Sequence, residues 1–268
     1  GHGDGSTDRD VTGPEPEADD LPDLAELDDH RLAAALAGEA GDLLLGLRQR
    51  ARLLDWSPWE LEDRGDMQAH HHLLDRLTEA RPDDAVLSEE GRDDRSRLGS
   101  DRTWIIDPLD GSHDFSGYSN DYAVHVALVV DGRPTAAAVS IPEIGQVFAT
   151  DDPVPDDPGR DAPIIVAGRT QARWAMAVAH VLGGEALIAG SAGVKAMAVV
   201  RGQADVYLHP SGLYEWDACA PAAVAEAVGM DAVDIDGKPI DYNKDYPIVR
   251  GFVVARPRFL QPVLDTLR

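Results

Sequence analysis

Cysteine is almost absent from this chain: Cys219 is the single one among 268 residues. One thiol excludes an intramolecular disulfide and any zinc site built on several cysteines. It agrees with a reducing compartment, so the cytoplasm is the expected location. The sequence also lacks a hydrophobic run near the roughly 20 residues that cross a bilayer, and its start is acidic. We therefore expect neither a membrane anchor nor a signal peptide.

Basic residues are scarce as well, with 24 Lys and Arg against 49 Asp and Glu and a formal net charge of −25. Such a field repels the phosphates of nucleic acids and of anionic membranes, so we expect neither a nucleic-acid polymer nor a membrane as a partner. A small phosphate ester would need local cations to overcome the same field. A phosphorylated small-molecule substrate would therefore favour a bound divalent metal.

The length and the 43% hydrophobic content allow one large domain or two closely packed lobes. Residues 1–27 hold few large apolar side chains and are predicted to form a mobile acidic tail. Residues 28–155 combine two helices with antiparallel strands, which predicts an α+β lobe. An Asp- and Pro-rich segment at 151–163 predicts the boundary, and strands alternate with helices over 156–268, as in a layered α/β lobe.

Apolar spacing predicts the individual elements. A long amphipathic helix is expected to begin at Asp28 or Asp29, and a second helix is expected near Asp66, ending before Pro82. The other predicted elements are strands at 85–88, 103–107, 122–130, 135–141, 146–150, 164–167, 186–189 and 204–208, and helices at 173–182, 194–201 and 217–228.

The most informative stretch is residues 104–112, Trp-Ile-Ile-Asp-Pro-Leu-Asp-Gly-Ser. An apolar strand leads into a proline-stiffened turn that carries Asp107 and Asp110 three residues apart. Two neighbouring ionised carboxylates are unfavourable unless a cation compensates them, and carboxylate oxygens suit Mg²⁺ or Mn²⁺. Taken alone, the stretch is equally compatible with an ordinary Asp-Pro turn after a buried strand.

Three other acidic segments lie at predicted strand ends or helix starts. They contain Glu89 and Glu90, Asp66, and the pair Glu215 and Asp217. Taken singly, each is explained as a helix cap or as an acidic strand end. Taken together, they fall at the edges of a layered α/β fold, where ligands bind.

Five strings occur in a fixed order along the chain. They are Leu-Ser-Glu-Glu at 87–90, Trp-Ile-Ile-Asp-Pro-Leu-Asp-Gly-Ser at 104–112, Gly-Ser-Ala-Gly-Val-Lys at 190–195, Gly-Gln-Ala-Asp-Val-Tyr at 202–207 and Glu-Trp-Asp-Ala-Cys-Ala at 215–220. Over roughly residues 30–268, their order and spacing resemble the inositol monophosphatase-like superfamily of metal-dependent phosphatases. Within it, the chain is most similar to the 3′(2′),5′-bisphosphate nucleotidase branch of the CysQ type.

The resemblance implies a fold and an activity. The implied fold class is α/β (α+β), a layered α/β/α/β/α sugar-phosphatase fold of two intimately packed lobes with the active site between them. The implied reaction is hydrolysis of the 3′-phosphate of 3′-phosphoadenosine 5′-phosphate to AMP and phosphate, with two or three Mg²⁺ ions per site or with Mn²⁺. A link to sulfate assimilation, sensitivity to Li⁺ and a homodimer are implied as well.

The resemblance also implies roles for individual residues. Metal binding is implied for the side chains of Glu89, Asp107, Asp110 and Asp217 and for the backbone carbonyl of Leu109. The backbone N–H groups of Gly111 and Ser112, with the Ser112 hydroxyl, match the groups that hold the substrate phosphate. Asp66 matches the acid that acts with this hydroxyl to orient and deprotonate the attacking water.

Two features depart from the family pattern. The family usually has Thr where this chain has Ser112, which keeps the hydroxyl but frees the rotamer. The segment before Asp66 also lacks the expected Lys and Thr, so Asp63 remains an alternative. We favour Asp66 because a helix that begins there places the leucines of 73–77 on its buried face.

Other candidates have both a structural and a functional interpretation. With Ser191 in the preceding turn, Lys195 either is an exposed lysine or contacts a nucleotide phosphate or base. Glu215 either binds a sugar hydroxyl or caps a helix. Consecutive helical residues point about 100° apart, so the histidines at 70–72 are expected to be structural, and Cys219 is expected to be a small core residue.

Two alternative functions remain open from the sequence. An inositol monophosphatase or a fructose-1,6-bisphosphatase would use the same scaffold and the same metal-binding acids. A more remote alternative is a non-catalytic sensor of divalent metal or of phosphorylated metabolites.

Overall fold

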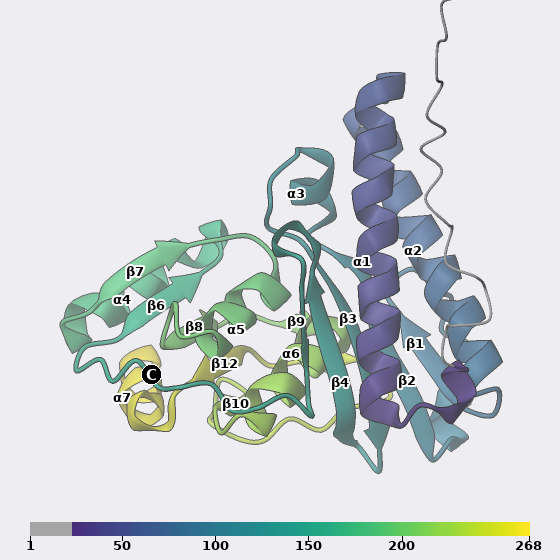
Figure 1. Ribbon diagram of the computed structural model, residues 1–268. Coiled ribbons are helices and arrows are strands. Elements are labelled where there is room, and N and C mark those ends of the chain that lie inside the picture. Colours follow the sequence, from purple (N-terminus) through teal and green to yellow (C-terminus); the bar gives the residue numbers. More distant parts are fainter. Residues whose placement is uncertain (1–22) are drawn as a thin grey trace, which may run out of the picture.

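The structure, a computed structural model, describes residues 23–268 (Figure 1). Most of the predicted tail, residues 1–22, lies outside the described residues. At the end of this tail the structure differs from the prediction. Leu24–Glu26 form a short 3₁₀ helix capped by the Asp23 side chain, and the Leu24 side chain is buried. One buried leucine therefore attaches this segment to the fold before the first long helix.

Two long helices cover one side of the molecule (Figure 1). The first, α1 (Asp29–Leu54), begins as predicted, because the Asp28 carboxylate accepts a hydrogen bond from the backbone N–H of Arg31 at 2.8 Å. Its leucines and alanines recur at helical spacing and form a buried stripe that packs on the neighbouring sheet.

The second helix, α2 (Pro58–Ala80), begins eight residues before the predicted start at Asp66. Ser57 caps it by accepting a hydrogen bond from the backbone N–H of Glu60, and proline is favoured in a first helical turn. Asp66 therefore lies inside α2. The prediction that it stands at a helix start is wrong.

Five strands form the first sheet in the order β1-β2-β3-β4-β5. They are β1 (Ala85–Ser88), β2 (Arg102–Asp110), β3 (Ala123–Val130), β4 (Arg133–Ile141) and β5 (Gln146–Ala149). β1 runs parallel to β2, and the remaining pairs are antiparallel. Helices cover both faces, which explains why β2 and β3 are apolar almost throughout rather than alternating.

The second sheet has the order β10-β12-β8-β6-β7, and β9 and β11 form a separate two-stranded ribbon. The strands are β6 (Ile164–Ala167), β7 (Glu185–Ile188), β8 (Val206–His209), β9 (Leu213–Tyr214), β10 (Asp231–Val233), β11 (Ile248–Val249) and β12 (Phe252–Ala255). The helices after β5 are α4 (Ala172–Leu182), α5 (Ala192–Val200), α6 (Glu215–Ala227) and α7 (Pro257–Leu267). Elements after residue 228 had not been predicted.

The elements stack in five layers, which confirms the predicted fold class (Figure 1). α1 and α2 cover the outer face of the first sheet, α5 and α6 lie between the two sheets, and α4 and α7 cover the far face of the second. The central layer shares one hydrophobic core with both sheets, and Cys219 is fully buried there, as expected. The division into lobes near residue 155 stays a prediction.

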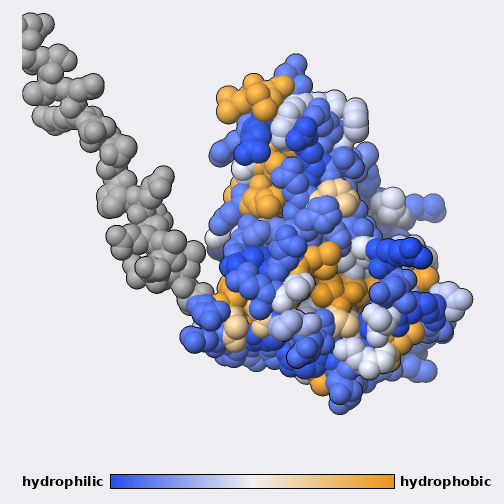
Figure 2. Space-filling view, turned by 90° about the vertical axis from the view of Figure 1, so that its right-hand side faces the viewer, coloured by the Kyte–Doolittle hydropathy of each residue, from blue (hydrophilic) through white to orange (hydrophobic). Residues whose placement is uncertain are grey.

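The molecular surface seen in Figure 2 is mainly hydrophilic, with smaller hydrophobic areas. Leu53, Leu54 and Trp59, at the turn between α1 and α2, are among the exposed apolar side chains. Scattered apolar residues of this kind are normal on protein surfaces. Within residues 23–268, no helix has the length and apolar character needed to cross a membrane.

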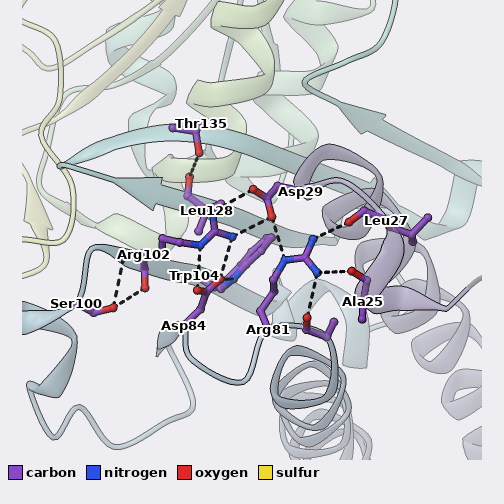
Figure 3. A network of polar contacts seen from close by, with 11 residues as sticks. Ala25, Leu27, Asp29, Arg81, Asp84, Ser100, Arg102, Trp104, Leu128 and Thr135 are labelled. Carbon is purple, nitrogen blue, oxygen red and sulfur yellow. Dashed lines mark hydrogen bonds and ion pairs between the residues drawn. The ribbon is translucent and has the colours of Figure 1, made fainter.

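An ion-pair network ties α1 to the beginning of the first sheet (Figure 3). Arg102 contacts Asp29 and Asp84 at 2.9 Å each, and Arg81 contacts Asp29 at 3.1 Å. Asp84 also accepts the indole N–H of Trp104 at 2.8 Å. The ion pairs are partly exposed and contribute little, whereas the Trp104 side chain is fully buried and needs a hydrogen-bond acceptor.

We predict that Asp84→Ala lowers the free energy of unfolding by about 1–3 kcal/mol, because it leaves the buried indole N–H of Trp104 without an acceptor. Asp84→Asn keeps an acceptor and should cost less. Asp83→Ala is the matched control, since Asp83 is exposed, and should change the same quantity by less than about 0.5 kcal/mol. Urea denaturation followed by tryptophan fluorescence measures all three, and equal losses at 83 and 84 would contradict the assignment.

Candidate active site

The predicted acidic turn lies where β2 ends. The register with β3 shifts between Asp107 and Asp110, so the strand bulges there, and the Asp107 carboxylate accepts the backbone N–H of Leu109 at 3.3 Å. Gly111 follows with a φ of +86°, and a Cβ there would lie 2.6 Å from the backbone oxygen of Asp121. Only glycine fits this position, and both aspartates are buried.

Four carboxylates from three elements converge beyond this turn. Asp107, Asp110 and Asp217 each offer an oxygen within 4.8 Å of the others, and Glu89, just after β1, lies close enough for its charge to raise the pKa of Asp107. Asp217 stands in the first turn of α6, where its carboxylate accepts the backbone N–H of Tyr214 at 3.0 Å. The structure therefore brings together all four acids whose side chains were predicted to bind metal.

Burial and mutual repulsion control the protonation of this cluster. Burial first, then the charges of Glu89, Asp110 and Asp217, raise the pKa of Asp107 well above its usual range. Burial, followed by the charge of Asp110, raises the pKa of Asp217 to about 7. Oxygen donors that cannot all stay ionised without a counter-charge fit a hard divalent cation. Metal binding by these four acids and by the carbonyl of Leu109 stays a prediction.

Asp110 differs from the other acids because donors surround one of its oxygens. Its Oδ2 accepts the Ser191 hydroxyl at 2.5 Å and the backbone N–H of Gly193 at 2.8 Å, and it lies 3.1 Å from Nε2 of His125. Although burial alone would raise it, the pKa of Asp110 falls to about 2, chiefly through His125. The Nδ1 of His125 donates to the carbonyl of Trp216 at 2.8 Å.

His125 was missed by the sequence analysis. It lies fully buried on β3 between the Asp110 turn and the start of α6, and it contacts the carboxylate of Asp110 and the carbonyl of Trp216, the residue before Asp217. A histidine in the otherwise apolar strand Ala-Val-His-Val-Ala-Leu-Val-Val is a signal that could have revealed it. Buried polar side chains need partners. Here the Trp216 carbonyl is the hydrogen-bond partner of Nδ1, and Nε2 lies within ion-pair distance of the Asp110 carboxylate.

Asp66 and Ser112 form the second part of the site. The Ser112 hydroxyl donates to Oδ1 of Asp66 at 2.7 Å. Burial raises the pKa of Asp66 to about 7, helped by the charges of Glu90 and Glu89 and opposed by the hydrogen bond from Ser112. Asp63 is exposed on the same helix. The contact with Ser112 therefore favours Asp66 over Asp63, for a reason other than the predicted helix start.

Three further residues were predicted to bind substrate, and their surroundings differ: Lys195, Ser191 and Glu215. Lys195 is buried, which lowers its pKa, and its ammonium lies 5.3 Å from the Tyr207 ring centre. Ser191 donates to Asp110 and caps α5. Glu215 is fully buried, and its two oxygens accept the backbone N–H groups of 243 and 244 at 2.6 and 3.1 Å. Glu215 therefore holds the loop at 243–244, and its contact with a sugar hydroxyl stays a prediction.

A cavity of about 460 Å³ lies beside the Ser112 turn. Its walls come from α3 (Ser112–Ser116), the loop after it, the segment after β6 and the start of α5. His113, Arg169 and Lys195 bring positively charged or ionisable nitrogen groups to it, and Asp114 and Asp121 are also in its lining. The cavity is large enough for a small phosphorylated molecule next to the acidic cluster.

Comparison with known proteins gives consistent matches. The model of the inositol monophosphatase family matches residues 33–152 and 166–265. A relative from Mycobacterium leprae named 3′-phosphoadenosine 5′-phosphate phosphatase is 43% identical over 259 residues, which span 91% of this chain and 95% of the relative. The 3′(2′),5′-bisphosphate nucleotidase CysQ of Escherichia coli O157:H7 is 30% identical over 78% of this chain and 91% of the relative.

Solved structures agree with these matches. CysQ from Bacteroides thetaiotaomicron superposes with a TM-score of 0.71 at 27% identity, over 84% of this chain and 96% of that one. Mycobacterium tuberculosis SuhB gives a TM-score of 0.69 at 26% identity, over 89% of this chain and 94% of that one. The predicted resemblance and fold are confirmed, and the chain belongs to the inositol monophosphatase family.

Proposed function

We propose that this protein is a metal-dependent phosphomonoesterase that hydrolyses the 3′-phosphate of 3′-phosphoadenosine 5′-phosphate to AMP and phosphate. The observation that carries the proposal is the convergence of the acidic cluster at the end of β2, two residues before Ser112, whose hydroxyl donates to Asp66. A cavity lined by His113 and Lys195 lies beside this turn. The substrate is suggested by relatives of 43–44% identity that are named for this activity. The homodimer implied by the resemblance stays a prediction.

The proposed cofactor is two or three Mg²⁺ ions, with Mn²⁺ as a substitute. The side chains of Glu89, Asp107, Asp110 and Asp217 would hold them, together with the carbonyl of Leu109. When bound, the ions would neutralise phosphate charge and lower the pKa of water. The fold supplies the ligand geometry, because backbone N–H groups hold one oxygen each of Asp107, Asp110 and Asp217.

The residues of the β2–α3 turn would bind the phosphate and move the proton. The first N–H groups of a helix lack partners within it, so those of Gly111 and Ser112 are available to phosphate oxygens. The Ser112 hydroxyl would accept a proton from the attacking water and pass its own to Asp66, which already accepts it at 2.7 Å. A pKa of about 7 suits Asp66 for this role near neutral pH.

The remainder of the substrate would occupy the neighbouring cavity. Lys195 and Arg169 line it and would pair with the second phosphate, while the loop after α3 would contact the nucleoside. Ser191 would act through Asp110 rather than on the substrate. Glu215 has no substrate contact in this proposal, because it holds the loop at 243–244 instead.

The substrate assignment is tested with purified enzyme and Mg²⁺ on 3′-phosphoadenosine 5′-phosphate, inositol 1-phosphate and fructose 1,6-bisphosphate. We expect the highest kcat/KM for the nucleotide. Lys195→Met should reduce that kcat/KM by about tenfold or more, because a charge-assisted contact is lost, and should affect inositol 1-phosphate less. A preference for inositol 1-phosphate would refute the assigned substrate while leaving the phosphatase activity in place.

The proton relay is tested by single substitutions. Asp66→Asn and Ser112→Ala should each lower kcat by roughly 10²–10⁴-fold, the usual contribution of a positioned acid or base. Asp63→Asn is the matched control three residues away on α2 and should retain near wild-type kcat. Loss of activity in Asp63→Asn with retention in Asp66→Asn would reverse the assignment of the two acids.

Removal of metal should expose the repulsion within the cluster. Since burial and Asp110 raise the folded-state pKa of Asp217 to about 7 from 3.8, the folded protein keeps a proton that the unfolded chain releases. This contribution to stability is present below about pH 4 and is lost as the pH rises to 7. In EDTA, the melting temperature should therefore decline over that range.

Asp217→Asn removes the charge but keeps the acceptor for the Tyr214 N–H. It should raise the metal-free free energy of unfolding at pH 8 by about 2–4 kcal/mol, while abolishing hydrolysis and reducing the rise in melting temperature caused by Mg²⁺. Asp83→Asn, an exposed control, should change none of these. Calorimetry with and without Mg²⁺ measures the effect, and an Asp217→Asn variant that Mg²⁺ stabilises as much as the wild type would exclude Asp217 as a ligand.

A further inference from the structure

The phosphate-binding turn depends on a helix that cannot be stable by itself. α3 has only five residues, far fewer than a helix needs to persist alone in water. The loop that follows contains Tyr118 with a φ of +60°, a conformation unfavourable for a non-glycine residue. Together, α3 and this loop provide Ser112 and much of one cavity wall. Something outside the segment must hold it in place.

Arg48, in the second half of α1, forms hydrogen bonds to α3 and to the loop that follows it. Its Nε donates to the carbonyl of Phe115 at 3.0 Å, and its Nη2 donates to the carbonyls of Asp114, at 3.2 Å, and Ser119. The guanidinium is only 3% exposed, although arginine is rarely buried. One side chain thus bonds three carbonyls spread over the helix and its loop.

The guanidinium itself is held in a fixed orientation. Its Nη1 donates to Glu143 at 2.6 Å, and the Tyr122 hydroxyl donates to the same carboxylate at 2.9 Å. The rings of Phe115, Tyr118 and Tyr122 surround it, with centres 5.2, 5.4 and 4.6 Å from the central carbon. These contacts satisfy a buried charge and restrict its rotation.

We propose that Arg48 is a positioning residue that sets the phosphate-binding turn and the cavity wall relative to each other. The proposal rests on the function proposed above. The loop held by Arg48 continues to Asp121, whose carboxylate accepts the backbone N–H of Gly190 at 2.9 Å and whose carbonyl packs against Gly111. A shift of this loop would therefore move Ser112 and the cavity rim together.

The metal ligands do not share this support. Glu89, Asp107, Asp110 and Asp217 lie at the ends of β1 and β2 and at the start of α6, and within residues 23–268 Arg48 forms hydrogen bonds to none of them. Loss of Arg48 should therefore impair phosphate binding and catalysis while leaving metal affinity intact. If Arg48 had a merely structural role, its replacement would lower the stability of the protein. Phosphate binding and metal binding would then both stay unchanged in the folded molecules.

The decisive variant is Arg48→Lys, which keeps the charge but cannot bond three carbonyls at once. Arg52→Lys is the matched control, because Arg52 lies one turn further along α1 and its guanidinium carbon lies 4.3 Å from the ring centre of Tyr118. In the part of the chain that the structure describes, Arg52 forms no hydrogen bond to α3. The measurements are binding of inorganic phosphate by calorimetry in saturating Mn²⁺, the Mn²⁺ dissociation constant by electron paramagnetic resonance, and kcat and KM.

We expect Arg48→Lys to weaken phosphate binding by about tenfold and to lower kcat/KM by roughly 10²-fold, as misplacement of a reacting group by about 1 Å does. The Mn²⁺ dissociation constant should stay within about twofold, and Arg52→Lys should resemble the wild type in every measurement. Phosphate binding unchanged in Arg48→Lys, or Mn²⁺ binding lost in parallel, would overturn the proposal.

A second variant covers the case in which Arg48→Lys does not fold. Glu143→Gln retains the arginine but weakens its anchor, and it should produce a smaller loss of phosphate affinity, about threefold to fivefold, with unchanged Mn²⁺ binding. No loss in Glu143→Gln would then count against the proposal. A wild type that binds phosphate but does not hydrolyse the nucleotide would refute the proposed substrate and leave the role of Arg48 standing.

Discussion

Three converging carboxylates that repel one another have to be held together by the surrounding fold. Asp107, Asp110 and Asp217 approach one another within 4.8 Å in a buried site, and none of them would remain there without support. Each gives one oxygen to a backbone N–H group from a turn or a helix start. The two sheets and the helices between them share one hydrophobic core. This core fixes the positions of the peptide groups that bind the three carboxylates, and so it offsets the repulsion between them.

The acidic cluster also bears on how a chain of net charge −25 can bind an anionic substrate. The overall field opposes phosphate, so attraction has to be local. Lys195 is buried beside the cavity and Arg169 lines it, while the acidic cluster presents oxygens that suit divalent cations. Because Asp114 and Asp121 also line the cavity, these two cations are matched by two acids there, and bound divalent cations would supply the remaining positive charge. The acidic surface discourages polyanions of larger size.

Patterns local in the sequence predicted much of this arrangement. The turn with Asp107 and Asp110 was visible because strand, proline and acids are adjacent, and the alternation of elements indicated the layers. Asp66 was placed at a helix start because the Ser57–Pro58 signal eight residues earlier was overlooked. His125 and Arg48 were missed for another reason: their partners lie far away in the sequence, and only the packing of strands and helices brings them together.

The proposed role of Arg48 also bears on how a serine can stand at position 112, where the family usually has threonine. Threonine restricts its own rotamer through the extra methyl group, whereas Ser112 does not. Here the hydrogen bond to Asp66 at 2.7 Å fixes the hydroxyl instead. That bond can form only if α3 keeps its place against α2, and the carbonyls that Arg48 binds lie on α3 and its loop. Ser112 lacks the methyl group that would restrict its rotamer. The fixed position of α3 restrains its hydroxyl instead.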